Sequence, residues 1–197
     1  MKKRNILLAT ALLSVGSVFA QTLPDGMTAL LPSGVTPNIT QDKKFIMQKN
    51  LTVAGSPEKG YYAFFSASDS DHGEELWVTD GTPEGTRMVK DINPGVATSD
   101  VNYLTRFNDK VVFSADNGED GYQLWISDGT EEGTRMVKKI HEFDSSNPIG
   151  FCQMNETQFI FFASDYESEN FSSEGAQKWL YVSDGTEEGT KLVAQVD

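Results

Sequence analysis

Two short acidic segments contain the residues whose types and spacing come closest to a chemical site. Their carboxylates are Asp69, Asp71 and Glu74 in the first segment and Asp116, Glu119 and Asp120 in the second. Carboxylates at such short intervals beside a glycine can wrap Ca²⁺, a hard cation that takes oxygen ligands. Neither segment contains the complete ligand set of an EF-hand loop. Calcium is therefore the one candidate cofactor, with solvated acidic turns as the alternative.

The composition gives little support to other chemistry. The chain has one cysteine and two histidines, too few for an internal disulfide or a multi-thiolate zinc site. Cys152 is predicted to be a small buried residue beside Phe151. No hydrolase, Walker or dinucleotide motif occurs, so no catalytic residue is predicted. With 29 acidic and 16 basic residues, the net charge of -13 argues against binding to nucleic acid or an anionic membrane.

The first twenty residues have the features of a secretory signal peptide. Residues 2–4 are all basic, and a mostly apolar run over 6–19 follows. Small residues at the end of this run place cleavage between Ala20 and Gln21. The run is too short and too rich in Ser, Thr and Gly for a membrane anchor. We therefore expect an exported protein, extracellular, at the cell surface or periplasmic, with no transmembrane segment in its mature form.

One segment of the chain occurs three times. Residues 73–90 recur at 121–138, and a more divergent copy covers 179–193. Equivalent positions hold Trp77, Asp80, Gly81, Thr82, Gly85 and Thr86 in the first copy, Trp125, Asp128, Gly129, Thr130, Gly133 and Thr134 in the second, and Tyr181, Asp184, Gly185, Thr186, Gly189 and Thr190 in the third. The aligned aspartates are 48 and 56 residues apart, which is the spacing of a repeat protein.

Each copy predicts a strand, a turn and a second strand. Leu76 and Val78 alternate with Trp77 and Thr79, so the two pairs should face opposite sides of a sheet. The Asp-Gly pair favours a tight turn, because glycine accepts a positive φ. The second glycine, Gly85 in the first copy, is expected to provide the same backbone freedom and could form a β-bulge.

A second hairpin precedes each copy. It is predicted over 51–67 in the first unit, 103–115 in the middle unit and 151–163 in the third. Each unit then has four short strands over roughly 48 residues, which is typical of a β-propeller blade. A stacked β-meander or a β-solenoid is the alternative.

The expected organisation is therefore all-β: a partial, propeller-like array of three four-stranded meander blades after a cleaved signal peptide. The signal peptide covers 1–20, and a proline-containing segment over 21–45 precedes the first blade, with at most one strand around 44–47. The three repeats extend over 46–98, 99–146 and 147–197.

Residues 75–82, Glu-Leu-Trp-Val-Thr-Asp-Gly-Thr, resemble the signature of the bacterial ELWxxDGT-repeat family. The resemblance extends over about 51–197. The second copy departs from the signature at Gln123, and the third has Trp179 in place of the glutamate. The resemblance implies an exported, often surface-associated bacterial protein with propeller-like blades and no common enzymatic activity.

The repeated side chains are best explained as structural. Trp77, Trp125 and Tyr181 recur at one position, as packing between blades requires of a large flat side chain. Sugar stacking by an exposed aromatic is the alternative. Arg87 and Arg135 also recur, and we expect them to pair with neighbouring glutamates at the surface or between blades.

These patterns favour an exported, non-catalytic scaffold or binding module whose partner is a protein or a glycan. The alternatives are a glycan-active hydrolase or lyase that uses the carboxylates of the acidic segments, and a truncated member of a longer repeat protein. Three blades cannot close a ring alone, because closed propellers have about four to eight. The open ends should therefore promote self-association, for example of two chains in a six-bladed ring.

Overall fold

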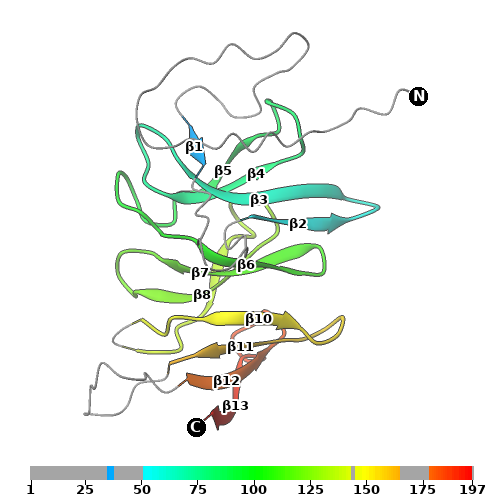
Figure 1. Ribbon diagram of the computed structural model, residues 1–197, viewed down its shortest axis with the longest axis vertical. Coiled ribbons are helices and arrows are strands. Elements are labelled where there is room, and N and C mark those ends of the chain that lie inside the picture. The colour runs from blue at the N-terminus through cyan, green and yellow to red at the C-terminus, as the bar shows by residue number, and fades with distance from the viewer. Residues whose placement is uncertain (1–34, 38–50, 143–144, 165–177, 197) are drawn as a thin grey trace, which may run out of the picture.

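The computed structural model describes residues 35–37, 51–142, 145–164 and 178–196. Within those ranges the chain forms thirteen strands and no helix (Figure 1). The expected signal peptide over 1–20, the strand expected around 44–47 and the acidic residues 165–175 of the third repeat lie outside the described residues.

The strands form three antiparallel sheets, each a meander of four consecutive strands. The first sheet contains β2 (Leu51–Ser56), β3 (Gly60–Ser68), β4 (Glu75–Thr79) and β5 (Arg87–Lys90). The second contains β6 (Asn102–Phe107), β7 (Lys110–Asp116), β8 (Tyr122–Ser127) and β9 (Arg135–Lys138). The third contains β10 (Ile149–Gln153), β11 (Phe159–Ala163), β12 (Lys178–Ser183) and β13 (Lys191–Val196). The all-β prediction is thereby confirmed.

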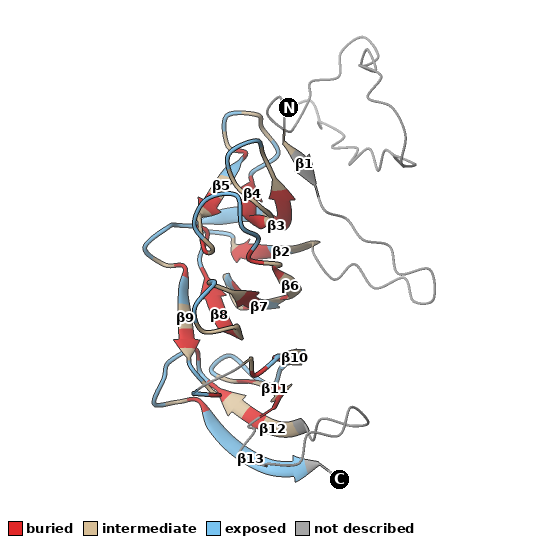
Figure 2. Cartoon of the chain, turned by 90° about the vertical axis from the view of Figure 1, so that its left-hand side faces the viewer, coloured by how far each residue is buried: buried red, intermediate tan, exposed pale blue. Residues whose placement is uncertain are grey.

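The sheets follow one another along the long axis of the molecule and bury apolar side chains between them (Figures 1 and 2). Alternation along each strand decides which neighbour a side chain meets. Leu76 and Val78 of the first sheet pack towards Phe113 and Trp125 of the second. The second sheet presents its other face, which includes Ile126, to the third in the same way. Each interface is therefore made by unlike faces of successive repeats.

The first strands of the three sheets lie beside one another. Strand β6 contacts both β2 and β10. The guanidinium of Arg106 donates to the carbonyl oxygen of Gly55 at 3.2 Å. On the other side, the side-chain amide of Asn108 donates to the carbonyl oxygen of Glu156 at 2.7 Å. Polar contacts thus join the three sheets along one side of the array.

A short strand from the N-terminal segment extends the first sheet. Strand β1 (Thr36–Pro37) pairs with the end of β3, where Thr36 is opposite Ser68. Residue Val35 packs on the face of the first sheet that carries Phe65 and Trp77. This strand was not foreseen, because a two-residue pairing leaves no alternating pattern in the sequence. Val35 thus covers part of the face on which no other described sheet packs.

Candidate functional site

The Asp-Gly-Thr turn of each repeat is a closed hydrogen-bonded unit. In the first copy, Asp80 Oδ1 accepts from the amide and the hydroxyl of Thr82, at 2.9 and 2.6 Å. The Thr82 hydroxyl oxygen accepts from the amide of Gly85, and the Thr86 hydroxyl donates to the carbonyl oxygen of Thr82. The bonds from Thr82 hold the pKa of Asp80 below its ordinary value. The same four bonds recur in the second and third copies.

The two glycines of the turn have different roles. Gly81 has a φ of 91°, as expected of the first glycine. The expectation of positive φ at Gly85 is wrong, because the described glycines with positive φ do not include it. A Cβ at Gly85 would instead lie 2.1 Å from Asp80 Oδ1, so the carboxylate occupies the space of a side chain. The bulge lies further on, at Val89, where the pairing of β4 with β5 shifts register.

Arginine joins the second and the third turn to the preceding sheet. The guanidinium of Arg87 donates to the carbonyl oxygen of Gly129 at 2.7 Å, and Arg135 donates to that of Gly185 at 2.7 Å. The expected pairing with glutamate is therefore wrong. The guanidinium instead satisfies a backbone carbonyl in the turn, an acceptor whose position is fixed by the backbone and which would be costly to bury unpaired.

A lysine three residues later repeats the arrangement. The ammonium of Lys90 donates to the carbonyl oxygen of Thr134 at 3.2 Å, and Lys138 donates to that of Thr190 at 3.1 Å. The positions of Arg87 and Lys90 correspond to Lys191 and Ala194 in the third sheet. The third sheet therefore lacks one of the two donors and has a lysine in place of the arginine.

The repeated aromatic residues are buried. Trp125 lies between the first and second sheets and stacks on Phe113, while Tyr181 lies between the second and third and stacks on Phe161. Trp77 is covered by Met88 and the N-terminal Val35. All three rings are at most 6% exposed, which leaves no open face for a sugar to stack on.

A buried polar side chain holds the link between successive repeats, a role that sequence reasoning missed. The carboxylate of Glu75 accepts from the amides of Ile92 and Asn93, at 2.9 and 3.2 Å. Gln123 occupies the same position in the second sheet and accepts from the amide of Ile140 at 3.1 Å. The sequence could have indicated this role, because a Glu or Gln stands directly before Leu-Trp in the first two copies. Burial raises the pKa of Glu75 to about 7, although its hydrogen bonds oppose the shift.

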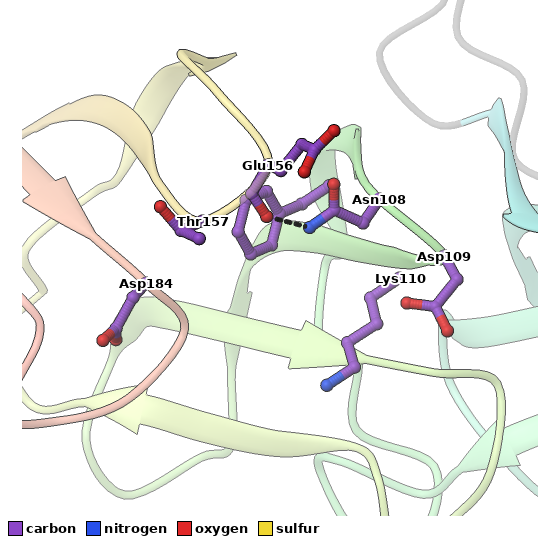
Figure 3. A pocket seen from close by; sticks show the side chains of 7 residues that line it. Asn108, Asp109, Lys110, Glu156, Thr157 and Asp184 are labelled. Atoms are coloured by element: carbon purple, nitrogen blue, oxygen red, sulfur yellow. Dashed lines mark hydrogen bonds between the residues drawn. The ribbon is translucent and has the colours of Figure 1, made fainter.

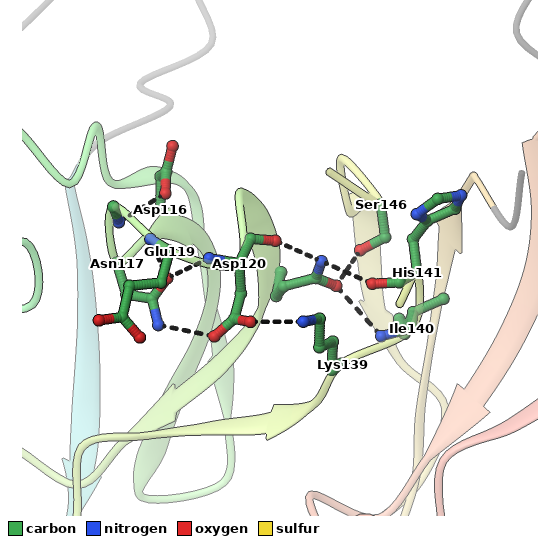
Figure 4. A network of polar contacts seen from close by, with 10 residues as sticks. Asp116, Asn117, Glu119, Asp120, Lys139, Ile140, His141 and Ser146 are labelled. Atoms are coloured by element: carbon green, nitrogen blue, oxygen red, sulfur yellow. Dashed lines mark hydrogen bonds and ion pairs between the residues drawn. The ribbon is translucent and has the colours of Figure 1, made fainter. Parts of the chain in front are cut away.

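The carboxylates of the acidic segments are largely engaged in local contacts. Asp69 Oδ1 accepts from the amides of Asp71 and His72, and the Asp71 amide bond in particular lowers the pKa of Asp69. Asp120 forms an ion pair of 2.6 Å with Lys139 (Figure 4). Asp116 accepts from the amide of Gly118. Glu119 is exposed, Glu74 is half-buried, and the described parts of the chain contain no cluster of three potential metal ligands.

Cys152 is exposed, so the prediction that it is buried is wrong. It lies on β10 opposite Ile160, and paired residues in an antiparallel ladder point to the same face. That face of the third sheet is turned away from the second sheet. The sequence could not show that Cys152 lies on an open face. Side chains alternate along the strands of the third repeat as they do in the other repeats, whether or not another sheet packs on a given face.

The outer face of the third sheet is largely apolar, and no other described sheet packs on it. Its residues Ile160, Phe162 and Val182 are half-buried. Register places on it Ile149, Cys152, Ile160, Phe162, Leu180 and Val182, together with Lys191 and Ala194. Val193 is the extra residue at the register shift of β13 and is equivalent to Val89 and Val137. Val193 is 54% exposed, whereas Val89 and Val137 at the same position are 4% and 3% exposed. Strand β13 is accordingly almost wholly exposed in Figure 2. This outer face is the strongest candidate for a binding surface.

An open hollow lies where the turns of the second and third sheets meet (Figure 3). Its lining includes Phe107, Lys110, Thr157 and Asp184. Asp109 at its rim pairs with Lys59 of the first sheet. The hollow is wide and shallow, and its polar side chains do not converge on one point, so it offers no arrangement for chemistry.

No family model, curated protein or solved structure matches the chain. In the ranges that the structure describes, no helix has the length and apolarity needed to cross a membrane.

Proposed function

We propose that this chain is an exported, non-catalytic repeat protein that acts as a scaffold or binding module at the bacterial surface or in the periplasm. The supporting observation is the use of the repeated residues. The polar groups of the turns bond to one another or to the preceding sheet, and the rings of Trp125 and Tyr181 lie between sheets. The repeated residues therefore hold the sheets together, and a binding site would have to use surfaces on which no other sheet packs.

The sheets are proposed to be propeller-like blades. In a propeller the first strand of each blade lies nearest the central axis, and successive blades pack face to face around it. The contacts of β6 with β2 and β10, and the two buried interfaces, fit this arrangement. The resemblance of residues 75–82 to the ELWxxDGT repeat supports the same proposal.

Export is tested by the N-terminus of the protein recovered from a bacterial host. We expect the chain outside the cytoplasm, beginning at Gln21 by mass spectrometry, because Ala20 ends a signal-peptidase site. Ala20→Tyr is the matched control, and its bulky side chain should leave the precursor uncleaved. Recovery of the wild-type chain in the cytoplasm with residues 1–20 attached would overturn the export proposal.

The non-catalytic assignment is tested with bacterial and plant polysaccharides. Incubation with the purified protein should release no new reducing ends and no unsaturated products. Release that disappears in Glu119→Gln, but not in Glu84→Gln on the first turn, would support a glycan-active enzyme instead.

A further inference from the structure

In the second sheet, side chains fasten the turn between β7 and β8 to the segment that follows β9. The carboxylate of Asp120 accepts from the side-chain amide of Asn117 at 2.9 Å and pairs with the ammonium of Lys139 at 2.6 Å (Figure 4). The equivalent positions of the first sheet hold Asp69, His72 and Asp91. The first sheet thus has a histidine in place of the carboxylate and a carboxylate in place of the ammonium.

The imidazole of His72 lies against the carboxylate of Asp69. Its Nδ1 is 2.9 and 3.1 Å from the two carboxylate oxygens. An ionised carboxylate only accepts hydrogen bonds, so Nδ1 carries the proton in this contact. Nε2 is then the atom that gains a proton when the ring becomes charged. The side chain is 31% exposed, so solvent can supply that proton.

The carboxylate of Asp91 has one oxygen without a donor. Its Oδ2 accepts from the amide of Gly95 at 3.1 Å, whereas Oδ1 is buried and has no hydrogen-bond partner among the described residues. The carbonyl oxygen of Gly95 in turn accepts from the amide of Gly73, the residue after His72, at 3.1 Å. Asp91 is thereby held near the imidazole, and a buried acceptor left without a donor is costly.

The charges that act on His72 favour its protonated form. The hydrogen bond with Asp69 raises the pKa of His72 most, and the negative charges of Asp69, Asp91 and Asp71 raise it further, against a smaller opposing effect of burial. Asp91 acts from the link between the first two sheets, residues 91–101, and the other two act from the loop that contains His72. A positive charge at His72 is therefore stabilised from both segments.

The other charged groups beside the link have different partners. The ammonium of Lys90, next to Asp91 in the chain, donates to the carbonyl oxygen of Thr134 in the second sheet. The carboxylate of Glu75 accepts from two backbone amides of the link, and Glu74 lies half-buried between Glu75 and the loop. These groups add negative charge near the loop and leave Asp91 Oδ1 without a donor.

We propose that His72 is a pH-dependent bridge between this loop and the link: in its protonated form, Nδ1–H donates to Asp69 and Nε2–H donates to Asp91 Oδ1. The neutral ring presents the lone pair of Nε2 to the same oxygen, and two acceptors repel each other, so the bridge opens. In the second sheet Asp120 and Lys139 are both charged on either side of neutral pH, so the equivalent contact persists. The inference goes beyond the proposed binding function and does not depend on it.

The direction of the pH dependence follows from the raised pKa. A group that binds its proton more tightly in the folded chain stabilises the fold fully below its unfolded pKa, here 6.5. That contribution is lost as the pH rises through the higher folded pKa. The joint between the first two sheets should therefore tighten in acid and loosen in base, whereas the joint between the second and third should not respond at this position.

Titration of the imidazole signals by NMR, in the full chain and in chelator, tests the contact directly. The chain has two histidines, and His72→Gln assigns them. We expect a midpoint for His72 above 6.5 that falls in Asp91→Asn. Asp71→Asn is the matched control, since Asp71 is exposed beside His72 and should lower the midpoint less. A wild-type midpoint at or below 6.5, or equal decreases in the two variants, would overturn the proposal.

Hydrogen exchange of the Gly95 amide reports on the link itself. It is measured in Glu75→Gln, which copies Gln123 and removes the other titrating group of this joint. Protection, corrected for the intrinsic exchange rate, should rise several-fold as the pH falls through 6.5.

A combined variant transplants the contact of the second sheet into the first. In the same Glu75→Gln background, the changes Asp69→Asn, His72→Asp and Asp91→Lys recreate the side chains of Asn117, Asp120 and Lys139, and protection at Gly95 should then be the same on both sides of pH 6.5. Protection that ignores pH before the transplant, or that still follows pH after it, would show that His72 does not make the bridge.

Discussion

The guanidinium of Arg87 and the carbonyl oxygen of Gly129, 42 residues apart, lie 2.7 Å from each other across the boundary between two sheets. The relationship recurs between Arg135 and Gly185. The turn glycine itself packs against the preceding sheet, since a Cβ at Gly129 would be 3.3 Å from the ring of Phe64. One turn thus contributes both an apolar contact and a hydrogen-bond acceptor to each interface.

Loss of this arginine should weaken the interface. Arg87→Ala and Arg135→Ala should each lower the free energy of unfolding by about 1–2 kcal/mol, since a hydrogen bond from a charged group is lost and the carbonyl is left partly buried. Urea denaturation measures the change. Lys191→Ala is the control, because Lys191 lies on a face that no sheet covers, and it should change stability by less than about 0.5 kcal/mol. Equal losses in all three variants would show that these side chains do not act across the interface.

The second glycine of the turn is expected to tolerate no side chain. Gly133→Ala should destabilise the protein by about 1–3 kcal/mol, because its Cβ would lie 2.0 Å from Asp128 Oδ1. The double variant Asp128→Ala with Gly133→Ala should cost less than the sum of the two single changes, since removing the carboxylate makes room. Strict additivity in thermal unfolding would contradict this steric explanation.

Glu75 should make stability depend on pH. Its pKa rises from 4.5 to about 7 on folding, chiefly through burial. Between those values the folded chain binds more protons than the unfolded chain, so the contribution of Glu75 to stability falls as pH rises. The shift corresponds to about 3 kcal/mol over the whole window.

Exchange of the two buried side chains tests this prediction. Glu75→Gln should remove the decrease in unfolding free energy between pH 4.5 and 7, and Gln123→Glu should add a similar decrease, because the two positions bind equivalent amides. The measurement is denaturant unfolding at several pH values, taken as a difference from wild type so that other carboxylates cancel. Unchanged pH profiles in both variants would exclude Glu75 as the titrating group.

Calcium should have little effect on stability. Asp69 accepts from two backbone amides and Asp120 pairs with Lys139, so each would have to give up a present partner to bind a cation. We expect melting curves in millimolar calcium and in chelator to superimpose. A ligand of the native state raises the melting temperature by mass action. An increase that is lost in Asp69→Asn, and not in Asp91→Asn, would restore the calcium hypothesis.

Local sequence patterns predicted most of the fold. The hairpin expected over 103–115 is present as β6 and β7, and those expected over 51–67 and 151–163 are present with shifts of a few residues at their ends. Alternation also placed Leu76 and Trp77 on opposite faces. These features depend on side chains close together in the chain, which is why one sequence was sufficient.

The sequence by itself determined the three strand–turn–strand copies, the positive φ of Gly81 and the alternation of side chains in the strand before each turn. Only the tertiary structure decided what each repeated side chain contacts. Arg87 meets a carbonyl rather than a glutamate, Gly85 makes room for a carboxylate, and Cys152 is exposed. The physical reason is that similar repeats have the same alternation of apolar and polar residues. Whether a given side chain is buried depends on whether another sheet packs on its face, which only the assembled sheets decide.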